Sequence, residues 1–252
     1  MPRSISFDRI ADRYDRTRGG LERGRSIAAA IDPFVAGTDW LLEVGIGTGA
    51  VAKAFVDRGH RVVGIDLSPE MLARAQTRVG MRVVCADAQG LPIATGSVPA
   101  AYVVWVLHLV ADPGAVVADV ARALRPGGRL VVNGGRPRNE SGDLTVFDTR
   151  LAHFRESRLN DDRPENVCSW AAAAGLLLAD CAERVGEFEL SPAEFAHNIE
   201  QRVFSYMWDL DEATWGMHMQ PVIDGLHALP DPERPRPCRH TDHILVFDKR
   251  PL

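Results

Sequence analysis

Short apolar runs alternate with helical patterns along the first half of this 252-residue chain. Each run is almost continuously apolar, as expected of parallel strands that helices cover on both faces. The predicted strands are residues 40–44, 61–65, 82–85, 101–106 and 129–132. Because helical patterns fit between these runs, the alternation predicts repeated βα units and a doubly wound α/β sheet.

Two of the predicted helices have clear boundary signals. Ser68 is a candidate N-cap, with Pro69 at the first helical position and Glu70 in the first turn. A second helix is predicted to open at the Asp-Pro pair of residues 112–113 and to be terminated by the Pro-Gly-Gly of residues 126–128. These signals mark the helix boundaries more firmly than periodicity alone.

The first predicted strand runs directly into a glycine-rich turn, residues 45–49, which opens a helix from about Ala50. Glycines let the backbone bend sharply and approach a ligand closely, because no Cβ intervenes. The turn also satisfies the dinucleotide pattern G-x-G-x-x-A. However, Glu43 is expected to point an anion toward the site, and the helix start carries no residue suited to a phosphate. A cationic ligand is therefore favoured over a pyrophosphate.

Two aspartates follow the next two predicted strands. Asp66 stands 21 residues after Gly45, where a carboxylate can accept hydrogen bonds from both hydroxyls of a ribose and would repel a 2′-phosphate. The alternative is that Asp66 only caps the following helix. Asp87 can accept from an adenine amino group while a neighbouring backbone amide donates to a ring nitrogen. Together these residues predict a nucleoside site.

The motifs resemble those of the class I S-adenosylmethionine-dependent methyltransferases, in particular the small-molecule group that includes the ubiquinone- and menaquinone-biosynthesis enzymes. The resemblance covers about residues 40–135 and rests on four motifs in family-like order: residues 43–49, 64–72, 86–92 and 124–128. It implies a Rossmann-like, seven-stranded, mostly parallel sheet whose last strand is antiparallel. Residues 239–249 are the candidate for that strand.

The resemblance also implies which residues hold S-adenosylmethionine. The glycines of the turn are expected to line its methionine part, Asp66 its ribose, and Asp87 with Ala88 its adenine. Residues 7–15 are similar to the leading helix of the family, so an aromatic and an arginine are expected to close over the cofactor, unless this is only a solvated helix. The expected cofactor contacts are Tyr14, Arg18, Glu43, Gly45, Gly47, Gly49, Asp66, Leu67, Met71, Asp87, Ala88 and Val104.

His108 is the first candidate for a catalytic base, because it follows the fourth strand, where open α/β sheets gather their ligands. His197 is the second candidate. Methyl transfer from a sulfonium is a direct displacement that mainly requires alignment and exclusion of water, so a base is optional. His108 can instead be a satisfied polar group at a strand end. No metal site is expected, since the histidines and cysteines lack ligand spacing.

Large aromatic and sulfur-containing side chains gather in residues 195–219. Such side chains suit a lid over a hydrophobic or aromatic acceptor, and the alternative is a cap with a small core of its own. Arg136 and Arg138 could hold an acidic substrate group, or belong to a solvated loop over residues 136–143. The expected acceptor contacts are His108, Arg136, Phe204, Trp208 and Trp215.

We expect a single domain, divided into an N-terminal helical segment (1–38), a cofactor-binding core (39–135), a substrate lid with the sixth strand (136–238) and the last strand (239–252). The net charge of −5 and the dispersed arginines do not favour nucleic acid as a partner. No apolar stretch approaches the roughly 18 residues of a membrane span, so we expect a cytoplasmic protein without a membrane partner.

The sequence therefore predicts S-adenosylmethionine-dependent methyl transfer to a small, hydrophobic or aromatic metabolite. Two alternatives stay open. An NAD-dependent oxidoreductase is favoured only by the G-x-G-x-x-A pattern, and a non-catalytic S-adenosylmethionine-binding protein would carry the same binding motifs.

Overall fold

The computed structural model describes residues 4–158 and 160–251, and for residues 135–139 and 158 it describes the backbone only. The chain divides into two compact units. The first unit comprises Met1–Arg136, Asn160–Arg184 and Asp242–Leu252, and the second comprises Pro137–Leu159 and Val185–Thr241.

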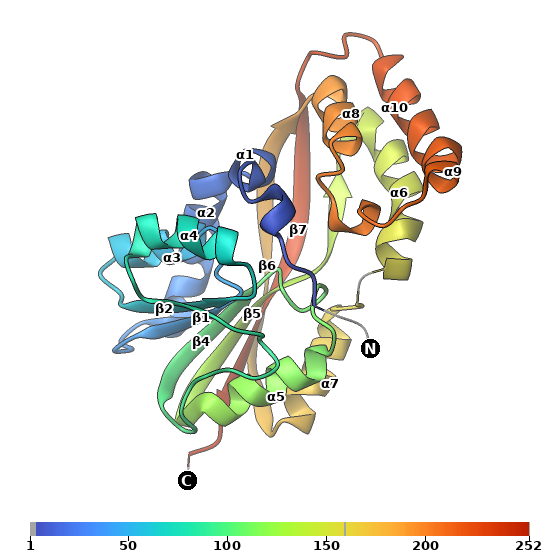
Figure 1. Ribbon diagram of the computed structural model, residues 1–252. Helices are drawn as coiled ribbons and strands as arrows, with labels where there is room; N and C mark the ends of the chain where they lie inside the picture. Colours follow the sequence, from blue (N-terminus) through green and yellow to red (C-terminus); the bar gives the residue numbers. More distant parts are fainter. Residues whose placement is uncertain (1–3, 159, 252) are drawn as a thin grey trace. The chain divides into compact units, whose positions relative to one another are not determined.

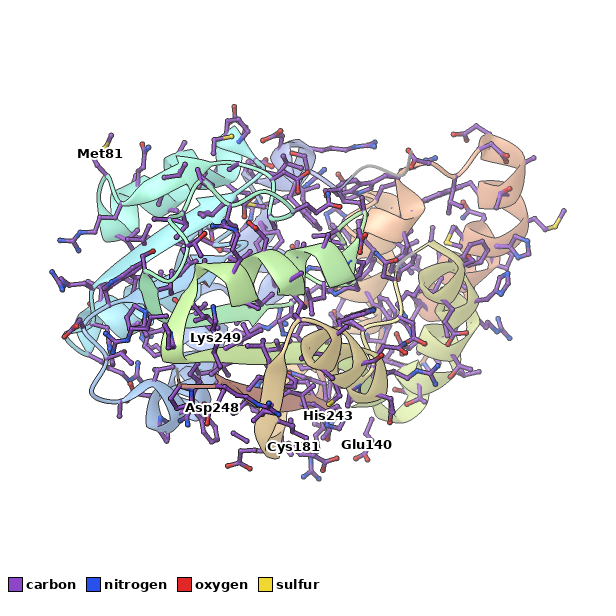
Figure 2. All side chains as sticks on the ribbon, turned by 90° about the horizontal axis from the view of Figure 1, so that it is seen from below. Met81, Glu140, Cys181, His243, Asp248 and Lys249 are labelled. Atoms are coloured by element: carbon purple, nitrogen blue, oxygen red, sulfur yellow. The ribbon has the colours of Figure 1, made fainter. Side chains whose placement is uncertain are left out.

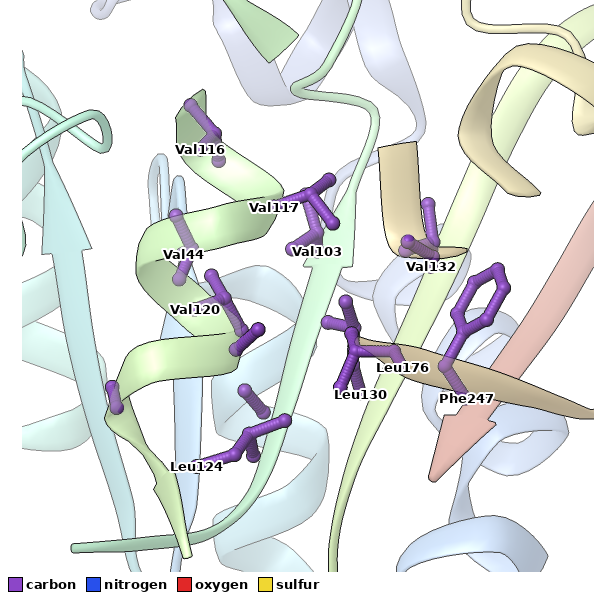
Figure 3. Close-up of a cluster of buried hydrophobic side chains, with 14 of the residues drawn as sticks. Val44, Val103, Val116, Val117, Val120, Leu124, Leu130, Val132, Leu176 and Phe247 are labelled. Carbon is purple, nitrogen blue, oxygen red and sulfur yellow. The ribbon is translucent and has the colours of Figure 1, made fainter. Parts of the chain in front are cut away.

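A seven-stranded sheet has the order β3-β2-β1-β4-β5-β7-β6 (Figure 1). Its strands are β1 (Leu41–Val44), β2 (Val62–Asp66), β3 (Val83–Cys85), β4 (Val98–Val104), β5 (Leu124–Glu140), β6 (Leu176–Leu190) and β7 (Arg236–Lys249). β1 pairs in parallel with β2 and β4, and the pairs β2–β3 and β4–β5 are also parallel. The last strand, β7, runs opposite to β4 (Figure 3). The predicted doubly wound, mostly parallel sheet is confirmed.

One predicted loop is wrong. Residues 136–143 were expected to be irregular, but β5 continues as a strand to Glu140. The paired register of β4 and β5 ends at Val104 and Asn133. Beyond that point β5 has no β4 partner on that side, so a proline and polar residues there interrupt no ladder with β4. The side chains of Arg136 and Arg138 lie outside the described residues, so their predicted role stays a prediction.

Helices cover both faces of the sheet in the first unit. The helices α2 (Gly20–Val35), α3 (Ala50–Asp57) and α4 (Pro69–Val79) pack on one face, and α5 (Pro113–Ala123) and α7 (Pro164–Ala173) pack on the other. Successive strand residues point to opposite faces. Leu41 therefore belongs to the core beneath α2, α3 and α4, and Leu42 to the core beneath α5 and α7. Figure 3 shows the α5 valines lying over Val44 and Val103. Two covered faces explain why the strands are apolar throughout.

Two predicted helix starts are confirmed at atomic detail. The hydroxyl of Ser68 accepts a hydrogen bond of 3.1 Å from the backbone N–H of Met71, at the start of α4. The carboxylate of Asp112 accepts one of 3.0 Å from the N–H of Ala115, at the start of α5. Each cap satisfies a backbone donor that the first helical turn leaves without a partner.

Charged side chains at the end of β7 fasten that strand to the sheet and to α5 (Figure 2). Asp248 receives two hydrogen bonds from the guanidinium of Arg129, of 2.7 and 3.1 Å. The ammonium of Lys249 donates to the carbonyl oxygens of Ala121 and Leu124, each at 2.7 Å. A cation at the carboxyl end of a helix is favourable, because the last carbonyls carry partial negative charge.

The second unit builds a core of its own. Its helical elements are η2 (Gly142–Leu144), α6 (Thr145–Arg158), α8 (Pro192–Glu200), η3 (Ser205–Met207), α9 (Glu212–Thr214), the π-helical turn η4 (Trp215–Met219) and α10 (Gln220–His227). A buried cluster joins them, with Phe195, Met207 and Leu226 among its members. Within the described part of the chain, no helix combines the length and apolar character needed to cross a membrane.

Candidate functional site

A cleft opens in the first unit at the carboxyl ends of β1, β2 and β4. The chain turns from β1 outward to β2 and β3 and then returns to β4 on the other side of β1, and open α/β sheets bind ligands at such a switch point. Its lining residues are Ser4, Ile5, Phe7, Tyr14, Gly45, Gly47, Ile65, Asp66, Leu67, Met71, Ala86, Asp87, Ala88, Val104, Trp105, Val106, Leu109 and Val110. Most of the expected cofactor contacts are therefore brought together.

The three glycines of the turn differ in what they make possible. All three have positive φ, a conformation that side chains rarely adopt. A Cβ at Gly45 would lie 2.2 Å from Cγ2 of Val106, so only glycine fits there. A Cβ at Gly47 would meet nothing within 4 Å, because this residue faces the cleft. Gly49 does not line the cleft; a Cβ there would lie 3.1 Å from the Cα of Ala75, so glycine lets α3 approach α4 closely.

The carboxylate of Asp66 joins the two loops that form the floor of the cleft. One oxygen accepts from the N–H of Gly47 at 2.8 Å and the other from the N–H of Ser68 at 2.9 Å. Burial raises the pKa of Asp66 above its ordinary value, although these two N–H groups act in the opposite direction. The cap of α4 is Ser68, so Asp66 is not needed for that role. The N–H of Leu67 also donates to this carboxylate, which has about four lone-pair sites and can therefore still accept from a ligand hydroxyl.

The structure corrects the expected orientation of Glu43. Its carboxyl group does not line the cleft; it is 2% exposed and accepts a hydrogen bond of 2.9 Å from the hydroxyl of Tyr102. Strand alternation places Glu43 on the face of Leu41, where it also accepts from the N–H of Ala52 in the first turn of α3. Burial raises the pKa of Glu43 well above its ordinary value, and the two hydrogen bonds only partly offset this. Glu43 therefore joins β1 to β4 and to the first turn of α3, which follows the glycine turn.

Asp87 and Ala88 lie in the cleft after β3, as expected for an adenine site. The Asp87 carboxylate accepts from the backbone N–H of Gln89 at 3.0 Å and from its side-chain amide at 3.2 Å. The hydroxyl of Ser4 accepts from that amide at 3.4 Å and from the N–H of Ala111 at 3.3 Å. The N-terminal segment thus bridges the loops that follow β3 and β4.

Two aspartates fasten the N-terminal elements η1 (Asp8–Ile10) and α1 (Tyr14–Arg18) beside the cleft. Asp8 accepts from the Ser68 hydroxyl, a contact that lowers the pKa of Asp8. Asp15 forms an ion pair with Arg78 and accepts from the Thr48 hydroxyl at 2.7 Å. Tyr14 lines the cleft, and its contact to the cofactor stays a prediction. The two anchors were not predicted, although both aspartates stand in the stretch that resembles the family's leading helix.

An aromatic and cationic pair that sequence reasoning missed stands at the end of β4. Trp105 lines the cleft, has a φ of 57°, and its buried indole N–H has no hydrogen-bond partner in the described residues. The guanidinium of Arg23 lies 5.1 Å above its ring, and the buried Nε of Arg23 likewise meets no acceptor in the described part. Arg18, the predicted arginine, does not line the cleft. No sequence pattern singled out Arg23, which lies far from β4 in the chain.

The two histidines proposed as bases lie in different surroundings. His108 follows β4, between cleft residues, but does not itself line the cleft, and its Nδ1 lies 3.3 Å from a carboxylate oxygen of Asp162. His197 belongs to the second unit, has a side chain 65% exposed, and lies 3.8 Å from the Glu200 carboxylate. His108 therefore has a buried carboxylate partner, whereas the carboxylate that pairs with His197 among the described residues is exposed.

The aromatic residues expected to contact the acceptor are engaged within the second unit. Phe204 stacks on Tyr206 with ring centroids 5.6 Å apart. The indole N–H of Trp208 donates to the carbonyl of Arg202 at 2.7 Å, and the Arg202 guanidinium lies 4.2 Å above the Trp215 ring. The second unit therefore has the packed core that is expected if it is a cap with a small core of its own.

The cleft has the features that an adenosyl ligand needs. A half-buried carboxylate that can still accept a hydrogen bond, a glycine open to the cleft and a second aspartate lie at the ends of adjacent strands. The fold and these groups define a nucleoside-binding domain of the doubly wound class.

The comparisons with known proteins find similarity to methyltransferases. Residues 42–132 match the model described as "Methyltransferase domain". A demethylmenaquinone methyltransferase of Thermobifida fusca is 34% identical over 145 residues, which are 52% of this chain and 61% of that protein. The chain thus spans about three fifths of the length of that relative.

Solved structures agree on the fold. The geranyl diphosphate C-methyltransferase of Streptomyces coelicolor, solved with S-adenosyl-L-homocysteine, has a TM-score of 0.54 at 15% identity and covers 89% of this chain and 75% of its own. The [4+2]-cyclase SpnF has a TM-score of 0.58 at 20% identity, covering 90% and 81%. Because a cyclase shares the fold, the fold alone does not define the reaction.

Residues 42–132 of the chain therefore match a methyltransferase domain, and this match supports S-adenosylmethionine as the ligand of the cleft. The match to methyltransferases disfavours the NAD-dependent alternative.

Proposed function

We propose that this protein transfers a methyl group from S-adenosylmethionine to a small, hydrophobic or aromatic metabolite. The observation that supports this most is the cleft itself, in which Asp66, Asp87 and Gly47 lie together at adjacent strand ends. In this proposal Asp66 accepts from the ribose hydroxyls and Asp87 from the adenine amino group. The bound cofactor would supply an electrophilic methyl group on a sulfonium.

Arg23 and Trp105 are our candidates for binding the carboxylate of the methionine part. Their buried N–H groups need acceptors, since an unsatisfied buried donor costs about 1–3 kcal/mol. A carboxylate can accept from both side chains, and the nearby Arg18 adds positive charge, whereas Arg184 is paired with Asp242. Tyr14 would complete this end of the cleft.

Isothermal calorimetry tests the cofactor choice directly. S-adenosylmethionine should bind at micromolar concentrations, and NAD should not, because the start of α3 carries no residue suited to a pyrophosphate. Micromolar binding of NAD without binding of S-adenosylmethionine at millimolar concentrations would contradict the proposal.

The acceptor is best sought with labelled cofactor. The name of the Thermobifida relative makes demethylated menaquinol the first acceptor to assay, followed by fractions of a metabolite extract. Transfer of label to a small molecule would support an enzyme; binding of S-adenosylmethionine without transfer to any fraction would favour a binding protein. Phe204, Trp208 and Trp215 stay predicted acceptor contacts, and tryptophan fluorescence should change when the acceptor joins the bound cofactor.

A further inference from the structure

We propose that Asp162 positions His108 to take the proton from a hydroxyl group of the methyl-accepting substrate. This inference rests on the proposed function. The carboxylate Oδ2 of Asp162 lies 3.3 Å from Nδ1 of His108. Asp162 is only 4% exposed, so solvent ions screen its interaction with the imidazole weakly. The pair therefore has the arrangement in which a buried carboxylate orients a histidine.

The chain brings this carboxylate to His108 through a segment that is hydrogen-bonded to the backbone of His108 and of Val110. Residues 160–162 return the chain to the first unit, just before α7. The N–H of Asn160 donates to the carbonyl of His108 at 3.0 Å, and the side-chain amide of Asn160 donates to the carbonyl of Val110. These bonds fix the loop after β4 and hold Asp162 against the imidazole.

Gly134 on β5 leaves room for the carboxylate. A Cβ at that position would lie 3.3 Å from Oδ2 of Asp162, which is tighter than an ordinary contact. The site is thus built from three separate stretches of the first unit: the loop after β4, the strand β5 and the returning segment. The local sequence around His108 gives no signal of this site.

The contact has a defined chemical consequence. An ionised carboxylate only accepts hydrogen bonds, so Nδ1 of the neutral imidazole must carry the hydrogen. Nε2 then holds the lone pair. When the acceptor hydroxyl reacts, its O–H bond breaks, the proton passes to Nε2, and the bonding electrons stay on the oxygen. The Asp162 carboxylate stabilises the resulting imidazolium, which later releases its proton to water.

Nuclear magnetic resonance of ¹⁵N-labelled protein tests the tautomer without an acceptor. The His108 signals are assigned by their loss in His108→Asn. We expect the Nδ1–H tautomer in the wild-type protein at pH 8 and a shift toward Nε2–H in Asp162→Asn. Asp161→Asn is the matched control, because Asp161 pairs with Arg163 in the same loop, and it should leave the tautomer unchanged. An Nε2–H tautomer in the wild-type protein would overturn the proposal, even if the Asp162 variants failed to fold.

Kinetics with S-adenosylmethionine and a hydroxyl acceptor found in the labelling assay give the second test. Asp162→Asn should lower kcat by roughly 10²- to 10⁴-fold, the usual effect of losing a positioned base. It should leave cofactor affinity unchanged and add no further loss in a His108→Asn background. Asp162→Glu should restore part of kcat. Methyl transfer by Asp162→Asn within threefold of wild type would sink this inference alone, whereas failure to bind S-adenosylmethionine would sink the proposed function.

Discussion

In the first unit, Asp66, Asp87 and Trp105 stand at strand ends and line an open cleft, whereas in the second unit Phe204 and Trp208 are engaged by neighbours of the same unit. The difference follows from the architecture of each unit. A parallel sheet ends all its strands at one edge, so side chains there have space on one side. The short helices of the second unit bury their large side chains in a shared core. Ligand chemistry is therefore easier to locate in the first unit.

The largest expected effect tests whether the core of the second unit is separate from cofactor binding. Met207 is fully buried in that core, so Met207→Ala should lower the free energy of unfolding by about 2–5 kcal/mol through lost burial and a cavity. Affinity for S-adenosylmethionine should not change in the folded protein. Urea denaturation and calorimetry measure the two quantities. The control is Met217→Ala, in which the methionine is 70% exposed; a parallel loss of cofactor affinity in Met207→Ala would break the comparison.

A complementary change in the first unit should have the opposite profile. Asp66→Ala removes the proposed ribose contacts and should weaken S-adenosylmethionine binding by about 2–4 kcal/mol, since hydrogen bonds to charged groups are individually worth about 1.5–3 kcal/mol. Calorimetry at fixed pH gives the affinity, with circular dichroism as the check of folding. Unchanged affinity in a folded variant would reduce Asp66 to its role of joining the Gly47 and Ser68 loops.

Glu43 gives a pH-dependent test of the contacts that join β1 to β4 and α3. Its folded-state pKa is raised by burial, so between its unfolded and folded pKa values only the unfolded chain ionises. This lowers the free energy of unfolding as pH rises, by up to about 1.4 kcal/mol per pH unit. Glu43→Gln should remove that slope and keep the contact to Tyr102. Urea denaturation from pH 5 to pH 8 measures it, and identical slopes in the two proteins would contradict the buried, neutral Glu43.

The smallest effect concerns the availability of Trp215. The Arg202 guanidinium lies 4.2 Å above its ring, and such a contact at a partly exposed site is worth about 0.5–1 kcal/mol. A double-mutant cycle with Arg202→Met and Trp215→Leu should give a coupling free energy of this size. A coupling of zero would mean that the indole is not engaged within its own unit, and would strengthen its predicted role at the acceptor.

The sequence predicted what short-range patterns encode. The strands β1 to β4, the Ser68 and Asp112 caps, and the positions of Asp66 and Asp87 all follow from local motifs. Contacts between distant stretches left no such signal: His108 and Asp162 are 54 residues apart, and Arg23 meets Trp105 from another element. The expected orientation of Glu43 failed because the motif locates a residue along the strand, whereas alternation decides its face.

The positive φ of Trp105 at the cleft has a consequence for the residue expected at this position in related sequences. A bulky residue at a φ of 57° carries strain of about 1–3 kcal/mol, which persists only where its surroundings hold it. Here the N–H of Trp105 donates to the carbonyl of Asn133 at 2.9 Å, and Arg23 covers the ring. In a related protein that no longer uses its cleft, selection for ligand binding no longer opposes the loss of this strained residue. We expect such proteins to carry glycine or asparagine at this position. The residue found there would therefore distinguish relatives that still bind a ligand in the cleft from relatives that do not.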